Sequence, residues 1–318
     1  MNRSTALMTA LLCLSLGLGV APSVTEAAQT ARAHKAHKVI AVKKHQRHKP
    51  SARKHAEAAQ ESSELKLHSS AAMVLDQTTG AVLFEKNAGA ILPIASISKL
   101  MTAMVALDAQ PNLEETLAID EADVDTLKGT HSRLRVGTQL SREEMLRLAL
   151  MSSENRAAAA LSRNYPGGRP AFIAAMNQKS QALGLQDTHF SDPTGLTAAN
   201  VSSAHDLVKM VSAAQQYPLI RQFTTTTEYE VALGGRPQTF RNTNSLVKNA
   251  AWDIGLSKTG YINEAGRCLV MQAWLNNKPI IIVLLDSLGK MTRVGDANRI
   301  KQWVENAAPA LLPHLAAG

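Results

Sequence analysis

The apolar pattern of this chain changes twice, and this change constrains the fold more than any other sequence feature. Short apolar runs at 71–75 and 81–84, separated by Asp76-Gln77-Thr78-Thr79-Gly80, predict a β-hairpin. Helical spacing follows in the middle of the chain, and strand patterns return from about Thr224. This order predicts an α/β protein of the α+β type. We expect an antiparallel sheet with the hairpin at its edge, flanked by helices and carrying an inserted helical lobe.

Individual elements follow from the same pattern. A buried helix is expected from Ser96 to Ala109, and Ser141-Arg142-Glu143-Glu144 forms a capping box that opens the next helix. That helix ends at a polar break, after which alanines 157–160 continue helically. Further helices are expected over 171–183, 204–214 and 294–307, and strands over 228–233, 254–258, 269–274 and 279–285.

Residues 1–27 are predicted to be a secretory signal peptide. Arg3 precedes an apolar run from Ala6 to Val20 that is too short for a comfortable membrane span, and Ala27 ends a small-residue cleavage pattern. An uncleaved anchor is the alternative. With cleavage we expect a periplasmic protein without a transmembrane anchor. Its remaining cysteine, Cys268, lies in an apolar run and is expected to fill the core.

Residues 28–64 are predicted to be a disordered linker rich in His and Lys. Between 29 and 60 there are nine Lys or Arg, one acid and almost no large apolar side chains, so burial cannot offset the ordering entropy. Residues 61–318 carry equal numbers of acids and bases, which argues against nucleic-acid binding by the folded domain, 65–318. We expect the linker to contact an anionic wall or membrane surface by charge; metal binding by its histidines is the alternative.

The motif Ser96-Ile97-Ser98-Lys99 places a hydroxyl and an amine on one face of the expected helix. A serine needs a base within hydrogen-bond distance to become a nucleophile, and a desolvated lysine can be that base. The N–H groups at the helix start also suit a developing oxyanion. Other Ser-x-x-Lys matches begin at Ser51, Ser63 and Ser245, but only Ser96 opens an apolar helix able to bury its lysine. By itself, Ser96 is equally well explained as a helix cap.

A second motif, Ser153-Glu154-Asn155, lies at the polar break between two expected helices. Such a break can project a hydroxyl and an amide into a cleft. The hydroxyl can relay a proton, and the amide can orient Lys99 and bind a substrate carbonyl. Ser162-Arg163-Asn164 matches the same pattern, so this motif alone is weak.

The triplet Lys258-Thr259-Gly260 occurs once and ends an expected strand. Lys258 offers a charge to a substrate carboxylate, Thr259 offers a hydroxyl, and Gly260 permits close approach of a peptide. Lys258 would also help to lower the pKa of Lys99. Alone, the triplet is better explained as a strand-end turn.

Together and in this order, the three motifs are typical of penicillin-binding proteins and class A β-lactamases. The chain resembles a low-molecular-mass penicillin-binding protein of the D-Ala-D-Ala peptidase group, family S11, from about Ser70 to the final helix. The segments most similar to the D-alanyl-D-alanine endopeptidase branch are 94–104, 150–157, 192–196 and 240–244. The resemblance implies a β-lactamase/transpeptidase-like fold. No Glu-x-x-Leu-Asn segment is present, so efficient β-lactam hydrolysis is not expected.

The resemblance also implies roles for the site residues. Ser96 would be acylated, Lys99 would accept its proton, and Ser153 with Asn155 would complete a proton relay. The substrate-binding residues would be Lys258, Thr259, Gly260 and Tyr261, with the N–H groups of Ser96 and Tyr261 forming the oxyanion hole. No metal or cofactor is expected.

The implied activity is cleavage of the D-Ala–meso-diaminopimelate cross-link in peptidoglycan muropeptides, with β-lactams as covalent inhibitors. A D-Ala-D-Ala carboxypeptidase with the same site is the alternative, because the residues named do not distinguish the two leaving groups. A non-catalytic wall-binding protein is an alternative of another class, and the complete set of motifs argues against it.

Overall fold

The computed structural model describes the backbone of residues 65–311 and the side chains of residues 65–306. The predicted signal peptide and linker lie outside this part of the chain. Among the described helices, none combines the length and apolar character needed to cross a bilayer.

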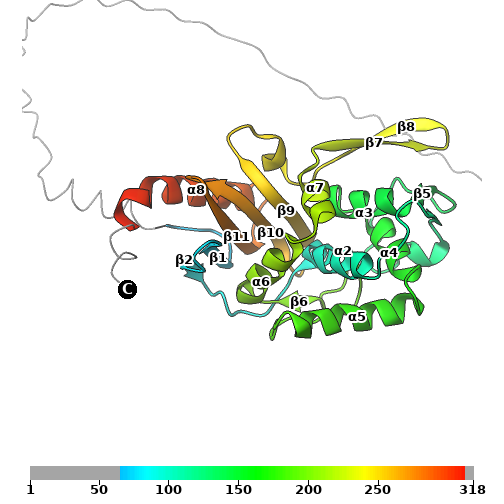
Figure 1. Ribbon diagram of the computed structural model, residues 1–318, viewed down its shortest axis with the longest axis horizontal. Helices are drawn as coiled ribbons and strands as arrows, with labels where there is room; N and C mark the ends of the chain where they lie inside the picture. Colours follow the sequence, from blue (N-terminus) through cyan, green and yellow to red (C-terminus); the bar gives the residue numbers. More distant parts are fainter. Residues whose placement is uncertain (1–64, 312–318) are drawn as a thin grey trace, which may run out of the picture. The chain divides into compact units, whose positions relative to one another are not determined.

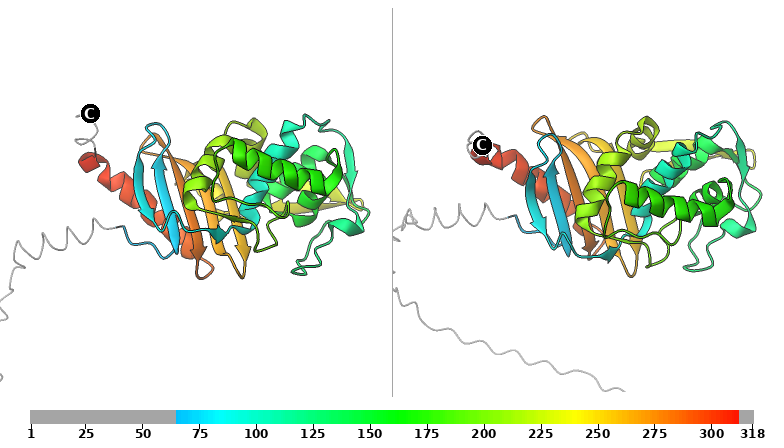
Figure 2. Two further views of the ribbon diagram at one scale, coloured as in Figure 1. Left: turned by 90° about the horizontal axis from the view of Figure 1, so that it is seen from below. Right: turned by 60° about the horizontal axis from the view of Figure 1, so that its bottom comes forward.

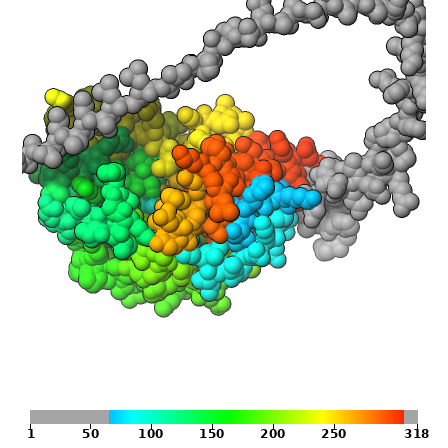
Figure 3. Space-filling view, turned by 180° about the vertical axis from the view of Figure 1, so that it is seen from behind, coloured from blue at the N-terminus to red at the C-terminus, as the bar shows by residue number. Residues whose placement is uncertain are grey.

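A five-stranded sheet in the order β2-β1-β11-β10-β9 forms the centre of the fold (Figure 1). Every neighbouring pair is antiparallel, and the N-terminal hairpin provides the β2 edge, as predicted. The first strand pairs with the last, placing Met73 opposite Val283. Figure 3 shows the consequence on the rear face, where the blue N-terminal residues lie beside the red C-terminal ones. The strands are β1 Ala71–Asp76, β2 Val82–Lys86, β9 Asp253–Ile262, β10 Gly266–Leu275 and β11 Lys278–Ser287.

The two faces of this sheet bury separate sets of apolar side chains, because successive residues of a strand point to opposite faces. Val270 and Val283 belong to the core on the side of helix α6, Ala204–Ala214, whereas Met271 and Ile282 belong to the core under helix α8, Thr292–Leu311. Figure 2 shows α8 on one side of the sheet and the remaining helices on the other. The predicted antiparallel sheet flanked by helices is confirmed.

The helical lobe is inserted between β3 and β7, and its helices surround the buried helix α2. Its helix α3 starts with the predicted capping box, in which Ser141 Oγ accepts from Glu144 N–H at 3.1 Å and Glu144 Oε2 accepts from Ser141 N–H at 2.9 Å. The lobe contains α2 Lys99–Asp108, α3 Arg142–Met151, α4 Asn155–Arg163, α5 Gly168–Ala182, α6 and α7 Pro218–Thr225. Short segments complete it: β3 Leu92–Pro93, β4 Thr116–Ala118, β5 Gln139–Ser141, β6 Val201–Ser202 and the 3₁₀ turns η1 Ala95–Ser98 and η2 Glu121–Asp123.

Two elements differ from the sequence expectation. The pattern did not predict α7 or strand β8, Arg236–Arg241, which pairs with β7, Glu228–Leu233, in a separate hairpin followed by η3, Ser245–Lys248. This hairpin is largely exposed, so its second strand lacks an apolar alternation that would reveal it.

The strand that carries the Lys-Thr-Gly triplet also differs from the expectation. It does not end at Lys258 but continues to Ile262, because β10 goes on pairing with it, as in Gly260 opposite Cys268. The apolar pattern of one segment cannot show how far a neighbouring strand continues to pair with it.

Candidate active site

Ser96 lies in the 3₁₀ turn η1, immediately before α2, so the helix expected to begin at Ser96 begins three residues later, at Lys99. The turn has an unusual backbone, since Ala95 adopts a φ of +49°, a left-handed conformation that is uncommon for a residue with a side chain. Gly195 packs directly against it: a Cβ at that position would lie 1.9 Å from the Ala95 carbonyl oxygen. The loop 192–196 therefore fixes the turn that presents Ser96.

Lys99 is 1% exposed and reaches three oxygens. Its Nζ lies 2.9 Å from Ser96 Oγ, 2.7 Å from Asn155 Oδ1 and 2.6 Å from the Thr194 carbonyl oxygen. The structure thus brings Ser96, Lys99 and Asn155 together, and all the hydrogen-bonding capacity of a lysine ammonium is used.

Burial lowers the pKa of Lys99 from 10.5 to about 7, although the carboxylates of Asp192 and Glu154 act to raise it. A charged amine loses hydration when it enters a protein interior, which favours the neutral form. Near neutral pH, a substantial fraction of Lys99 is therefore unprotonated and able to accept a proton from Ser96. Burial is the main cause of this shift, as expected for a desolvated lysine, and the help expected from Lys258 is not among its main causes.

Ser153 lies in the polar break between α3 and α4, two residues after the end of α3, and has a φ of +62°. Its Oγ accepts a hydrogen bond from Lys258 Nζ at 2.9 Å, so it contacts the lysine of β9. Lys258 is 1% exposed and also donates to the Thr259 carbonyl oxygen at 2.9 Å. Burial lowers its pKa well below the usual value, and the positive charges of Lys99 and Arg293 contribute.

The edge strand of the sheet, β9, lies beside Ser96. Thr259 Oγ1 donates to Thr243 Oγ1 at 2.6 Å. Gly260 passes so close that a Cβ there would lie 2.7 Å from the Ile94 carbonyl oxygen and 3.2 Å from the Ser96 nitrogen. Tyr261, the next residue, is about half exposed. The absent side chain at Gly260 is therefore what allows the strand to approach the serine turn.

The family assignment follows from this geometry and from sequence comparison. The model of the peptidase S11 family, described as D-alanyl-D-alanine carboxypeptidase, matches residues 56–289. The chain belongs to the S11 family of serine D-Ala-D-Ala peptidases. Its enzyme class, predicted from the three motifs, is confirmed.

Two curated relatives are named D-alanyl-D-alanine endopeptidase. The one from Pseudomonas aeruginosa is 50% identical over 252 residues, covering 79% of this chain and 81% of the relative. The one from Escherichia coli is 48% identical over 261 residues, covering 81% and 84%. The crystal structure of the Streptomyces K15 DD-transpeptidase superposes with a TM-score of 0.69 at 29% identity, covering 75% of this chain and 97% of that one. The predicted transpeptidase-like fold is thus confirmed.

Several residues of this S11 peptidase site received no role from the sequence. The Asp192 carboxylate accepts from the N–H groups of Gly195 at 2.7 Å and Thr197 at 3.0 Å, and so shapes the loop that supplies the Thr194 carbonyl to Lys99. An aspartate followed by Pro-Thr-Gly is a turn signal that could have identified this loop.

A second group of residues without a predicted role supports the Ser153-Glu154-Asn155 break. Asn155 Nδ2 donates to Thr130 Oγ1 at 3.0 Å, and Ser132 Oγ donates to Glu154 Oε2 at 2.7 Å. Burial raises the pKa of Glu154, against the effects of Ser132 and the nearby Arg133. No motif links these residues in sequence, since the loop 125–138 reaches the site only through the fold.

Arg293 is a further cation that sequence reasoning missed. Its Nη1 donates to the carbonyl oxygens of Gly260 at 3.0 Å and Cys268 at 3.2 Å. Burial lowers its pKa, as does the charge of Arg267. Arg293 therefore adds positive potential behind the β9 edge, where Lys258 already lies.

The competing motif matches lie elsewhere. Ser162 is buried in α4 and donates to the Ala159 carbonyl, while Ser245 lies in the turn η3. Cys268 is fully buried, and burial raises its pKa to about 11, so its predicted role as core filler is confirmed. Within the described residues, no cluster of His, Cys, Asp and Glu side chains has the arrangement of a metal site.

Proposed function

We propose that the protein is a D-alanyl-D-alanine endopeptidase that hydrolyses D-Ala–meso-diaminopimelate cross-links through an acyl-enzyme on Ser96. The observation that carries this proposal is the contact of 2.9 Å between Ser96 Oγ and a buried Lys99. The neutral amine takes the hydroxyl proton while Ser96 Oγ attacks the carbonyl carbon of D-alanine. The names of the relatives favour the endopeptidase reaction.

The remaining residues have complementary roles in this mechanism. The backbone N–H groups of Ser96 and Tyr261 hold the oxyanion of the tetrahedral intermediate. The carbon–nitrogen bond then breaks, and the leaving amine takes a proton by way of Ser153. Asn155 keeps Lys99 in place. Water finally attacks the ester, which releases the peptide acid and regenerates Ser96.

Lys258 and Thr259 bind the carboxylate next to the scissile bond, with Gly260 giving the peptide room to lie along β9. A bound carboxylate favours the protonated form of Lys258 and so offsets the cost of burying its charge. β-Lactams, whose strained amide imitates the D-alanyl peptide, acylate Ser96 by the same first step.

Digestion of purified muropeptides tests the reaction. Cross-linked dimers should be converted to monomers by the wild-type protein, and Ser96→Ala should abolish both this cleavage and covalent labelling by fluorescent penicillin. If only pentapeptide monomers lose a terminal D-alanine, the protein is the alternative carboxypeptidase. Penicillin labelling that persists in Ser96→Ala would contradict the role of this serine.

We further propose that the mature enzyme works in the periplasm and that residues 29–60 hold it near anionic wall or membrane surfaces by charge. The nine basic residues of this segment support the proposal. Deleting 29–60 should leave penicillin acylation unchanged but reduce sedimentation with purified wall material at low salt, with little difference at high salt. Equal retention of the two proteins at low salt would contradict it.

A further inference from the structure

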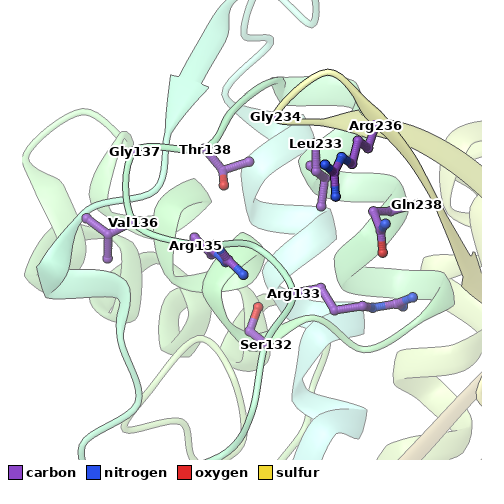
Figure 4. Close-up of a pocket in the computed structure, with 10 residues that line it drawn as sticks. All are labelled: Ser132, Arg133, Arg135, Val136, Gly137, Thr138, Leu233, Gly234, Arg236 and Gln238. Carbon is purple, nitrogen blue, oxygen red and sulfur yellow. The ribbon is translucent and has the colours of Figure 1, made fainter.

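A basic pocket lies between the loop 132–138 and the tip of the β7–β8 hairpin (Figure 4). Three arginines contribute to its walls, and no acidic side chain lines it. Its lining residues are Ser132, Arg133, Arg135, Val136, Gly137, Thr138, Leu233, Gly234, Arg236 and Gln238. The pocket therefore has the charge of an anion-binding site.

The three arginines differ in their freedom to bind an anion. Arg133 is fixed, because its Nη1 donates to the Thr239 carbonyl at 2.6 Å and its guanidinium stacks on the Phe240 ring at 3.6 Å from the centroid. Arg135 and Arg236 are exposed and make no ion pair or side-chain hydrogen bond within residues 65–306. They extend from the two opposite walls of the pocket (Figure 4). Their planar forks suit bidentate binding of a carboxylate.

The pocket is joined to the active site through both of its walls. On one side, Ser132 lines the pocket and donates to Glu154, the residue between Ser153 and Asn155. On the other side, β8 carries Gln238 and ends at Arg241, two residues before Thr243, which accepts a hydrogen bond from Thr259. Both walls of the pocket therefore connect to segments that hold site residues, so a ligand long enough to extend from Ser96 beyond these segments would reach Arg135 and Arg236.

We propose that this basic pocket binds a second carboxylate of the cross-linked wall peptide, distinct from the one held by Lys258 and Thr259. The proposal rests on the proposed function, since a cross-linked dimer presents two peptide strands with several carboxylates. Placing one of them between Arg135 and Arg236 gives an anionic partner to a pair of cations that has no acidic partner in the described residues. The pocket would then favour dimers that carry free carboxylates over those in which the carboxyls are amidated.

Binding to full-length Ser96→Ala protein tests this without cleavage. Calorimetric titration should show a free-carboxylate dimer binding about tenfold more tightly than the same dimer with its peptide carboxyls amidated outside the scissile unit. Adding Arg135→Gln and Arg236→Gln should remove the difference between the two ligands. Arg241→Gln is the matched control, because it changes the same charge on β8 but pairs with Glu228 at 3.5 Å and does not line the pocket. It should keep the full preference.

The outcomes separate this proposal from the proposed function. Equal binding of the two dimers, or a preference that survives the double arginine substitution, overturns the pocket assignment. Inorganic phosphate binding that depends on Arg135 and Arg236, without a preference between dimers, also overturns it. Failure of the wild type to cleave dimers overturns the endopeptidase reaction alone, because the titration does not require turnover.

Discussion

At the scale of single residues, the site depends on a lysine that the fold keeps partly neutral. Lys99 is among the largest fully buried side chains of the described region, and its ammonium is disfavoured there by lost hydration. Charge–charge attraction to Asp192 and Glu154 opposes the shift without cancelling it. The resulting pKa of about 7 is close to the pH at which a general base works best.

We expect penicillin acylation to rise with pH through the pKa of Lys99. Below about 7 the lysine is mostly protonated and cannot accept the Ser96 proton, so the rate should fall about tenfold per pH unit. Between pH 7 and 8 it should approach a plateau. Stopped-flow acylation from pH 5.5 to 8 measures this, and a flat profile over that range would exclude Lys99 as the base.

Lys99→Met should be inactive but should reveal the energetic cost of the buried amine. A pKa lowered from 10.5 to about 7 means that the unfolded chain binds more protons over this window, so wild-type stability rises with pH there. The stability of the variant relative to wild type should therefore decrease by about 1.4 kcal/mol per pH unit from pH 7 to 10. Guanidinium unfolding at several pH values measures the difference. A difference in unfolding free energy that is independent of pH would contradict the lowered pKa of Lys99.

At the scale of elements, three backbone segments meet at Ser96, the proposed nucleophile. The turn η1, the loop 192–196 and the strand β9 approach so closely that Gly195 and Gly260 have no room for a side chain. This contact, rather than the spacing of the motifs, sets the distance between Ser96 and the β9 edge.

Gly195→Ala should disrupt this contact. The added Cβ would lie 1.9 Å from the Ala95 carbonyl oxygen, and the residue has a φ of +79°. We expect a loss of about 2–4 kcal/mol in unfolding free energy and at least about a hundredfold slower acylation, since the Ser96 turn must shift.

Gly184→Ala provides the matched control for this prediction. Gly184 has a similar φ of +66°, but a Cβ added there would have no neighbouring atom within 4 Å. The substitution should cost only about 1–2 kcal/mol and leave acylation unchanged. Equal loss of acylation in the two variants would show that contact at Gly195 is not the cause.

At the scale of the whole molecule, the segment before the first strand is held against the last helix of the domain. Asp296 of α8 is fully buried and accepts from the N–H groups of His68 at 3.0 Å and Ser69 at 2.7 Å. Burial acts to raise its pKa, but the hydrogen bonds from Ser69, His68 and Arg299 outweigh that effect and lower it. The ionised carboxylate thus anchors the segment that leads into β1.

Asp296→Ala should destabilise the domain by about 2–4 kcal/mol at pH 7, because it leaves buried donors without an acceptor. The carboxylate contribution is complete above the unfolded-state pKa of 3.8 and declines as the pH falls below it, so the difference from wild type should shrink there. Asp253→Ala, at an exposed position, should change stability by less than about 0.5 kcal/mol. Denaturant titration compares the variants, and a difference that persists unchanged at pH 3 would contradict the role of ionised Asp296.

The sequence by itself determined the type and order of most main elements, the capping box at Ser141 and which of four Ser-x-x-Lys matches places its lysine on a buried helix. These features depend on local spacing and on the apolar character of neighbouring residues, both of which can be seen without a fold. Exposed elements such as β8 were not predicted, because a strand without a buried face shows no alternation of apolar and polar residues.

Only the tertiary structure decided which groups meet in the site and around it. The Thr194 carbonyl, the contact of Ser153 with Lys258, the cation Arg293 and the basic pocket at Arg135 and Arg236 all join segments far apart in the chain. The neutral fraction of Lys99 was likewise set by burial, which depends on every segment that packs around it. The motifs show which chemical groups the chain can offer to a site. The distances between these groups, and the burial that shifts their pKa values, arise from packing between distant segments.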